Sequence, residues 1–396
     1  MSRRRLLGCA AAGVLVVTMA AACSSGSSSS SSSSASAASS TSSASTASTP
    51  VAAPSGGSAP SGVAQAQKQL ATYENPDPTI TLPALSAKPP AGKTIDFVGC
   101  PLASCLEIQQ AAQAAAKAVG WTVHVFNGGI TPASFVSAMN DVVQSPGDGV
   151  LGIGILPNSA ISSQLAALRA KHVPWVAVAS PSPIGDDMIA NFSSSPEIAL
   201  SGKVMADWII SDSQGKANVA YFWDPTLTQH LPAKNAFVAE MGALCPGCTV
   251  SVQTTSFSTG IGTTDPAQIV SYLQRNPDTN YIVIGIGDAT AGIPEALAAA
   301  GLAGKVKIVT RLADTINFKD IQSGTEAMGV TEETYEIGWR MVDALARNFL
   351  GDSMACCTTP IGTVHVITKA DLPASLSVPY SVPGYQQFFL KAWRLQ

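Results

Sequence analysis

The sequence predicts an α/β protein of two Rossmann-like lobes, each a parallel sheet flanked by helices. The 303 residues that follow Lys93 are more than one hydrophobic core usually holds. In this part of the chain, short apolar runs rich in β-branched residues alternate with longer segments whose apolar residues recur at helical spacing. The alternation stops near Asn191 and then starts again. Two successive α/β units therefore predict two lobes.

The first unit consists of four expected strands and three expected helices. The strands are the runs 95–98, 122–126, 149–153 and 173–178, and the helices are the segments 106–119, 133–144 and 159–171. A strand, a helix and a further strand in succession form a right-handed crossover between parallel strands. The unit is therefore expected to form one parallel sheet.

The second unit repeats this pattern. Its expected helices are 201–210, 231–244, 265–276 and 294–300, and its expected strands are 217–222, 249–254, 281–286 and 306–310. Parallel α/β sheets bind ligands beyond the C-terminal ends of their strands. We therefore expect a ligand cleft between the lobes.

Residues 1–22 have the order of a secretory signal peptide. Residues 1–5 are basic, residues 6–22 are apolar, and small residues precede Cys23. The apolar run is short for a membrane span, which favours a cleaved signal. The segment resembles the lipobox of bacterial lipoproteins, and this implies a lipidated Cys23 and an exported protein on the outer face of the cytoplasmic membrane. The alternative is an ordinary signal with an incidental cysteine.

Residues 23–62 are expected to be a disordered tether after the anchor. From residue 24 onward they are almost entirely Ser, Ala, Thr, Gly and Pro, so they have little to bury in a core. Residues 63–93 are expected to form a helix followed by a Pro-rich extended segment. The tether would hold a folded body near a membrane.

Composition and motifs exclude several classes of function. The chain has 22 Lys and Arg against 26 Asp and Glu, and only 12% of its residues are charged, so nothing favours nucleic acid as a partner. The four histidines, at positions 124, 172, 230 and 365, lack metal-site spacing. The serine-hydrolase and zinc-protease motifs are absent from the sequence. We expect a protein that is not an enzyme and has no cofactor or metal.

Several short patterns recur in a specific order. They are AAAKAVGW at 114–121, GDGV at 147–150 with LPNS at 156–159, AKHVPWV at 170–176, GIGD at 285–288 and EIGW at 336–339. In this order they resemble the type I periplasmic-binding-protein fold, as in solute-binding lipoproteins of sugar ABC transporters. The resemblance covers the chain from about Thr94 to the C-terminus.

The resemblance implies a hinge of three segments, near 191–195, 329–332 and 367–369. The N-terminal lobe would then comprise 94–191 and 332–367, and the C-terminal lobe 192–331 and 368–396. Closure of the lobes about this hinge would enclose a ligand.

Only some of the sugar-binding residues of that family have counterparts in this chain. Its first loop carries asparagine and paired aromatic residues, whereas this chain has Leu102, Ser104 and Cys105 there. We expect ligand contacts from residues at strand ends and hinges, namely Ser104, Ser180, Phe192, Trp223, Asp224, Asp288, Arg311, Glu332 and Tyr335. Structural roles are the alternatives: packing for the aromatic residues, a helix cap for Asp288, an ion pair for Arg311, and bracing of the hinge for Glu332 and Tyr335.

Six cysteines beyond Cys23 form three close pairs, and export favours disulfides over zinc. We expect local bonds between Cys100 and Cys105 and between Cys245 and Cys248. The second pair matches a CxxC motif, but it follows an expected helix, whereas redox pairs open one. Cys356 and Cys357 could bond to each other or pair elsewhere.

The leading prediction is a monomeric solute-binding lipoprotein that captures a small polar, sugar-like ligand and delivers it to an ABC permease. Its only membrane contact would be the lipid anchor. Three alternatives stay open. The first is a surface sensor that feeds no transporter, and the second is a binder of a carboxylate, nucleoside or amino-acid-like ligand. The third is a redox protein that uses the CxxC pair.

Overall fold

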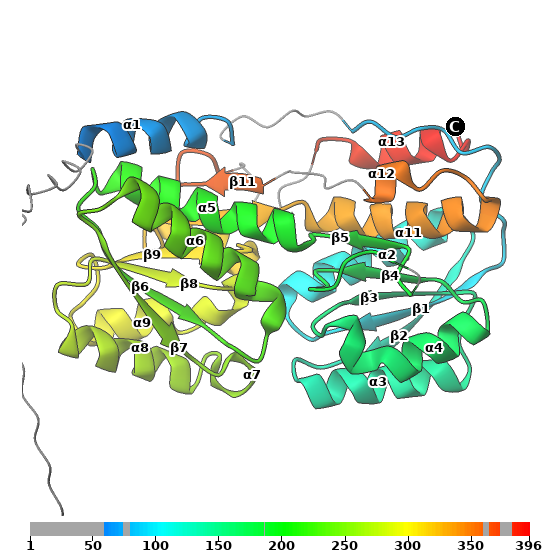
Figure 1. The fold of residues 1–396 in the computed structure, drawn as a ribbon, viewed down its shortest axis with the longest axis horizontal. Helices are drawn as coiled ribbons and strands as arrows, with labels where there is room; N and C mark the ends of the chain where they lie inside the picture. The colour runs from blue at the N-terminus through cyan, green and yellow to red at the C-terminus, as the bar shows by residue number, and fades with distance from the viewer. Residues whose placement is uncertain (1–58, 74–79, 186, 359–363, 373–381) are drawn as a thin grey trace, which may run out of the picture. The chain divides into compact units, whose positions relative to one another are not determined.

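We describe a computed structural model of the chain, in which residues 59–73, 80–185, 187–358, 364–372 and 382–396 are described. The expectations for the signal peptide, for Cys23 and for most of the tether lie outside these residues. Two sheets lie side by side, each between layers of helices (Figure 1), which confirms the predicted two-lobed α/β fold. None of the described helices has both the length and the hydropathy that a membrane-spanning helix requires.

The N-terminal lobe is a five-stranded parallel sheet in the order β2-β1-β3-β4-β5. Its strands are β1 (Thr94–Gly99), β2 (Thr122–Asn127), β3 (Gly149–Ile153), β4 (Trp175–Val178) and β5 (Ala190–Phe192). Helices α2 (Ala103–Ala118) and α11 (Thr334–Leu350) cover one face, and α3 (Pro132–Gln144) and α4 (Ser162–Ala170) cover the other (Figure 1). The central strands β1, β3 and β4 are buried on both sides, which explains their continuous apolar runs.

The C-terminal lobe is a six-stranded sheet in the order β11-β10-β9-β8-β6-β7, in which only the β10–β11 pair is antiparallel. Its strands are β6 (Asn218–Trp223), β7 (Thr249–Thr254), β8 (Tyr281–Ile284), β9 (Lys307–Arg311), β10 (Met328–Glu332) and β11 (Val364–Ile367). The helices around it are α5 (Ser195–Asp212), α6 (Leu231–Leu244), α7 (Phe257–Gly260), α8 (Thr264–Arg275), α9 (Ile293–Ala299) and α10 (Thr315–Ser323). The pattern did not identify β5, β10 or β11 as strands.

One close helix pair in each lobe depends on a glycine. A Cβ atom on Gly338 of α11 would lie 2.5 Å from the Cβ of Ala111 in α2. A Cβ atom on Gly202 of α5 would lie 2.0 Å from the carbonyl oxygen of Ala233 in α6. Any side chain at these positions would push the helices apart, so the sequence requires glycine at both.

Helix α1 (Ala59–Leu70) belongs to the C-terminal lobe. Val63, Ala66 and Leu70 are buried in the core formed with α5 and α6. The expected tether therefore ends earlier than 62, because the apolar face of α1 has a partner surface. Residues from Ile80 onward instead run along the N-terminal lobe, where Ile80 and Leu85 are buried.

The C-terminal segment corrects the expected lobe boundaries. Strand β11, expected in the N-terminal lobe, pairs with β10 of the other sheet. Helix α13 (Tyr385–Ala392), expected in the C-terminal lobe, packs on α11, where Trp393 stacks on Trp339 with ring centroids 5.3 Å apart. From β1 onward the chain thus passes between the lobes four times instead of the expected three, and the passage from α1 to β1 precedes these four. The two late crossings lie between α12 (Ala355–Thr358) and β11 and between β11 and α13.

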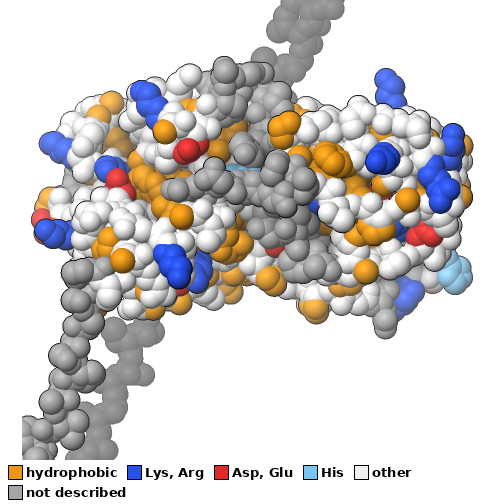
Figure 2. Space-filling view, turned by 90° about the horizontal axis from the view of Figure 1, so that it is seen from above, with side chains coloured by type: hydrophobic (Ala, Val, Ile, Leu, Met, Phe, Trp, Pro, Cys, Tyr) orange, Lys and Arg blue, Asp and Glu red, His pale blue; other side chains and the backbone are white. Residues whose placement is uncertain are grey.

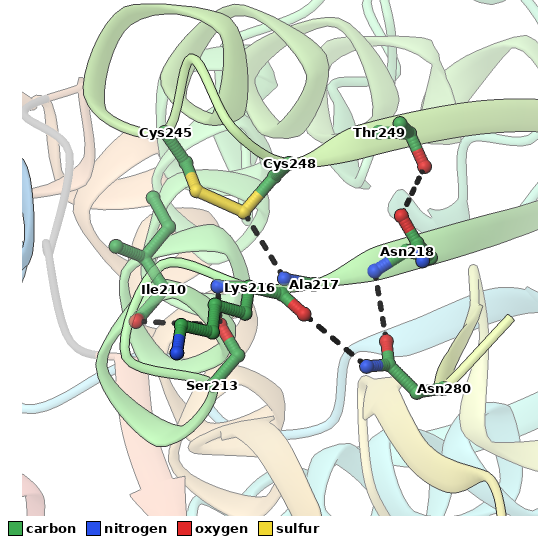
Figure 3. The surroundings of a disulfide bond; sticks show 9 residues. All are labelled: Ile210, Ser213, Lys216, Ala217, Asn218, Cys245, Cys248, Thr249 and Asn280. Carbon is green, nitrogen blue, oxygen red and sulfur yellow. Dashed lines mark hydrogen bonds between the residues drawn. A yellow bond between two sulfur atoms is a disulfide. The ribbon is translucent and has the colours of Figure 1, made fainter. Parts of the chain in front are cut away.

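Both expected local disulfides occur in the structure, Cys100–Cys105 and Cys245–Cys248. The second links the end of α6 to the start of β7, and Cys248 Sγ accepts a hydrogen bond from Ala217 N–H at 3.3 Å (Figure 3). Asn280 completes this corner by accepting from Asn218 N–H at 2.8 Å. The bond lies where strands β6 and β7 begin, at the opposite end of the sheet from the strand C-termini. This position favours a structural role over a redox site.

Charged side chains are sparse on the described part of the face shown in Figure 2, where Lys and Arg lie singly or in small groups. A continuous basic surface would be needed to hold a nucleic-acid backbone. The scattered arrangement agrees with the low charge content of the chain.

Candidate ligand-binding site

A cavity lies between the lobes at the C-terminal ends of both sheets. The N-terminal lobe contributes residues at or after the ends of β1 to β5 and in the first two turns of α2 and the first turn of α11: Cys100, Leu102, Ser104, Cys105, Ile108, Ile130, Ile153, Ile155, Val178, Ala179, Ser193, Thr334 and Ile337. The C-terminal lobe contributes residues at or after the ends of β6, β8, β9 and β10: Leu227, Gln229, His230, Ile286, Arg311, Leu312 and Glu332. Doubly wound sheets hold ligands at this position.

Most of the cavity wall is aliphatic. The Cys100–Cys105 disulfide forms part of it, on the loop between β1 and α2. This loop is where the sequence comparison with sugar binders found no aromatic pair. None of the described residues that line the cavity is Trp, Tyr or Phe. The wall therefore offers apolar contact without a ring on which a sugar could stack.

The polar part of the wall centres on Arg311, which is 1% exposed. Its Nη2 donates to Glu332 Oε1 at 2.7 Å, and its Nε donates to Ser201 Oγ at 2.9 Å. The Ser193 hydroxyl donates to the other oxygen of Glu332. Buried charges are tolerated when they are paired and hydrogen-bonded, and here the two opposite charges balance each other. The cavity wall is therefore close to neutral at this point.

His230 borders Arg311 and faces the cavity. Arg311 Nη1 lies 3.0 Å from His230 Nδ1, and because arginine can only donate, Nδ1 is the acceptor. Burial, with the nearby Arg311 charge, lowers the pKa of His230 to about 3. A neutral imidazole that accepts at Nδ1 carries its proton on Nε2. That buried Nε2–H has no partner among the described residues.

Gln229 precedes His230 in the 3-10 turn Thr228–His230, and both side chains are 5% exposed. The Gln229 Oε1 atom is buried and has no partner among the described residues. Buried polar atoms are nearly always hydrogen-bonded in folded proteins. One donor and one acceptor at the cavity wall are thus unused by the protein.

The two lobes touch directly at Asp288. This residue, 6% exposed, lies in the turn Gly287–Thr290 after β8. Its carboxylate accepts from Ala103 N–H at 2.7 Å and from Ser104 Oγ at 2.9 Å, both at the first turn of α2 in the opposite lobe. Burial raises the pKa of Asp288, while these hydrogen bonds act against the rise. The structure is therefore a closed arrangement in which a carboxylate of one lobe caps a helix of the other.

Of the nine expected ligand contacts, Ser104, Arg311 and Glu332 line the cavity, and Asp288 bonds to one of them. The other five are elsewhere. Ser180 exchanges hydrogen bonds with the Asn191 side chain through its backbone. Asp224 accepts from Thr226 Oγ1 at 2.6 Å within a turn.

The three expected aromatic contacts serve packing. Phe192 is in the core of the N-terminal lobe, and Tyr335 packs against the same core. Trp223 packs on the C-terminal core, and Lys234 Nζ lies 4.8 Å from its ring centroid. Apolar burial decided these positions in each case. The sequence pattern did not indicate Gln229, which lies in the 3-10 turn between β6 and α6. It did not indicate the aliphatic wall either, because aliphatic residues after strands resemble core residues.

Cys356 and Cys357 are free thiols in the structure. With Asp343 they form a group whose ligand atoms lie within 4.8 Å of one another. However, Asp343 already accepts from Arg347 Nε and from Trp393 Nε1, each at 2.7 Å. A positive guanidinium beside the carboxylate opposes a second cation, so the group does not fit a metal site.

A two-lobed α/β body with a cavity at the ends of both sheets is the architecture of a ligand-binding protein with its site between the lobes. Comparison with known families identifies which one: a family described as a periplasmic binding protein domain matches residues 105–353. The chain belongs to this family. Its members bind solutes rather than catalyse reactions.

Solved structures share this fold at low sequence identity. An ABC transporter solute-binding protein from Agrobacterium vitis with bound allitol is 18% identical, with a TM-score of 0.59 over 70% of this chain and 96% of that one. GanP, a glucose-galactose binding protein from Geobacillus stearothermophilus, is 19% identical, with a TM-score of 0.62 over 72% and 100%. The arabinose-transporter binding protein from Shewanella sp. ANA-3 is 17% identical, with a TM-score of 0.62 over 76% and 97%. No curated protein matches the sequence.

Proposed function

We propose that this protein is an extracytoplasmic solute-binding lipoprotein that captures a small molecule between its lobes and delivers it to an ABC permease. The observation that carries the proposal is the cavity at the ends of both sheets, enclosed by residues of both lobes. Family membership supports the same role. The signal-like residues 1–22 and Cys23 support export and lipid anchoring.

Closure would couple ligand binding to a change in the conformation of the protein. The bonds from Ala103 N–H and Ser104 Oγ to Asp288 exist only while the lobes are together. A ligand that contacts both walls adds affinity for this closed state alone, which is all that a shift of the equilibrium requires. A permease that recognises the closed form would then receive mainly loaded protein.

The anchor would be attached through the C-terminal lobe. Helix α1 follows the Ser-rich segment and is packed on α5 and α6, so a pull on the tether would reach that lobe first. The N-terminal lobe would remain free to move about the crossings near Ser193 and Glu333.

Sugars are the ligand class suggested by the relatives, whose names mention allitol, glucose, galactose and arabinose. The aliphatic wall and the absence of lining aromatic residues among those described do not support a sugar in this cavity. The proposed capture mechanism is independent of the ligand class.

Small-angle X-ray scattering of the full chain tests the proposal. Scattering and thermal unfolding are measured with and without each of a panel of candidate ligands. The panel contains pentoses, hexoses, polyols, small neutral alcohols, carboxylates, nucleosides and amino acids. We expect at least one compound to raise the melting temperature and to reduce the radius of gyration. A stabilising compound that leaves the radius unchanged would contradict capture by closure. Uptake of that compound by cells, lost when the gene is deleted, would separate transport from sensing.

A further inference from the structure

The polar side chains of the cavity wall differ in whether their hydrogen-bonding groups are already used within the protein. Of the polar side chains there, Ser104 donates to Asp288, and Thr334 donates to Glu107 at 2.9 Å. Ser193 and Arg311 both donate to Glu332. The hydroxyl protons of these residues are therefore committed within the protein, and the charge of Arg311 is balanced.

Two buried polar atoms on adjacent residues of η2 (Thr228–His230) have no partner among the described residues. His230 Nε2–H is a donor, as its tautomer requires, and Gln229 Oε1 is an acceptor. Both side chains are more than nine-tenths buried and line the same cavity. A hydroxyl group satisfies both, because its oxygen accepts while its hydrogen donates.

The rest of the ligand must match an aliphatic wall. Ile130, Ile153, Ile155, Val178, Ile286 and Ile337 line it, with the Cys100–Cys105 disulfide. A sugar would leave most of its hydroxyl groups against these side chains without hydrogen bonds, and each such group costs free energy when it loses water. A hydrocarbon surface gains free energy in the same place.

The size of the cavity limits the ligand further. About 60 Å³ is open to the centres of water molecules. At about 10–15 Å³ of such space for each water, the closed cavity has room for roughly four to six waters, comparable to a space that holds benzene. A short-chain or single-ring molecule fits this volume.

We propose that the ligand is a small neutral alcohol whose hydrocarbon part contacts the aliphatic wall and whose hydroxyl accepts from His230 Nε2–H and donates to Gln229 Oε1. This inference rests on the proposed function, since it assigns the solute class of the same cavity. A net charge on the ligand is disfavoured because Arg311 and Glu332 already neutralise each other.

Calorimetric titration of the full chain tests the assignment with matched probes. Cyclohexanol and 1-hexanol represent the proposed class, methoxycyclohexane accepts but cannot donate, cyclohexanecarboxylate is charged, and L-arabinose and D-xylose represent sugars. We expect the alcohols to bind, the methyl ether to bind roughly 3- to 10-fold more weakly for want of one hydrogen bond, and the carboxylate and pentoses to bind far more weakly.

The variant Gln229→Met removes the acceptor at similar size. We expect it to abolish the preference for cyclohexanol over methoxycyclohexane while both still bind. Gln65→Met, the same change at an exposed position of α1, should keep the preference. Melting temperatures of both variants show whether they fold.

Each outcome tests the alcohol assignment, the proposal of solute capture by closure, or both. Pentose binding with compaction in scattering, without alcohol binding, would overturn the alcohol assignment and leave solute capture standing. Alcohol binding without compaction would support the assignment and contradict closure. Binding of neither class, or equal binding of alcohol and ether by the unsubstituted chain, would overturn the assignment.

Discussion

Ser104 of the N-terminal lobe donates its hydroxyl to Asp288 of the C-terminal lobe across the cleft, with 2.9 Å between Oγ and Oδ2. The same carboxylate accepts the backbone N–H of Ala103 at 2.7 Å. The contact joins the turn after β8 to the first turn of α2, so it holds the cavity shut from the rim. In the proposed closure mechanism, the strength of this contact would set how much of the unliganded protein is closed.

Replacing Asp288 by Asn should open the cleft. A single amide oxygen cannot accept both bonds as the two carboxylate oxygens do, and the favourable charge at the start of α2 is lost. We expect the closed state to lose about 1–2 kcal/mol. Scattering should show a larger radius of gyration without ligand. Asp141→Asn, at an exposed position of α3, is the control, and an unchanged radius in Asp288→Asn would show that this contact does not hold the lobes.

Replacing Glu332 by Gln should destabilise the protein strongly. The change leaves the buried Arg311 charge without its partner, and breaking a buried ion pair in this way costs about 3–5 kcal/mol. Urea denaturation provides the measurement. The double variant Arg311→Leu/Glu332→Leu removes both charges and should recover part of the loss. If Glu332→Gln alone unfolds at the same urea concentration as the original chain, the pair contributes nothing.

Replacing Gly62 by Ala should release α1 from the C-terminal lobe. In an isolated helix this change is stabilising, by up to about 1 kcal/mol. Here the new Cβ would lie 1.9 Å from the carbonyl oxygen of Leu244, so the helix has to move away. We expect faster amide hydrogen exchange in Ala59–Leu70 than in the unsubstituted chain. Gln65→Ala, at an exposed position of the same helix, should leave exchange protected, and protection of α1 in both variants would rule out the tight contact.

Stability should fall as pH rises from about 4.5 to about 8. Burial raises the pKa of Glu326 and of Glu336 to about 8 each, and that of Glu107 to about 7. In this window the native state keeps protons that the unfolded state has lost. Each such group therefore lowers the free energy of unfolding by up to about 1.4 kcal/mol per pH unit.

Glu326→Gln isolates one of these groups. Its oxygen can still accept from Asn317 Nδ2, which lies 2.9 Å from Glu326 Oε2. We expect the variant to have a shallower decline of stability between pH 5 and pH 8, measured by urea denaturation at several pH values. Glu295→Gln, at an exposed position of α9, should follow the original curve. Parallel curves for Glu326→Gln and the original chain would refute the buried-acid explanation.

Much of the fold could be predicted from local sequence patterns. Helix Leu231–Leu244 and strand Thr249–Thr254 were predicted with the bounds that the structure has, because the Pro-Gly turn at 246–247 separates them clearly. Strands β5 and β11 were missed. They are three and four residues long, too short for alternation to be detected, and they form only because the neighbouring strands offer backbone partners.

The sequence predicted less of the candidate site than of the fold. Arg311 was identified at a strand end and Glu332 at a hinge, but their bond to each other is a tertiary contact between neighbouring strands. Phe192 was expected at the ligand from its place at a hinge and Trp223 from its place after a strand. An aromatic residue at either place serves packing or binding, and only the three-dimensional arrangement decides which.

The sequence by itself determined the class of this protein: two parallel α/β units, an export-like N-terminus and two local disulfides follow from periodicity, composition and spacing. The tertiary structure decided the lobe boundaries at the C-terminus, the docking of α1, and which residues line the cavity. The physical reason is that sequence patterns are local, whereas tertiary contacts join residues that lie far apart along the chain. Periodicity records which face of an element is buried, whereas the proton on His230 Nε2 is assigned only by Arg311, 81 residues away along the chain and 3.0 Å away in space.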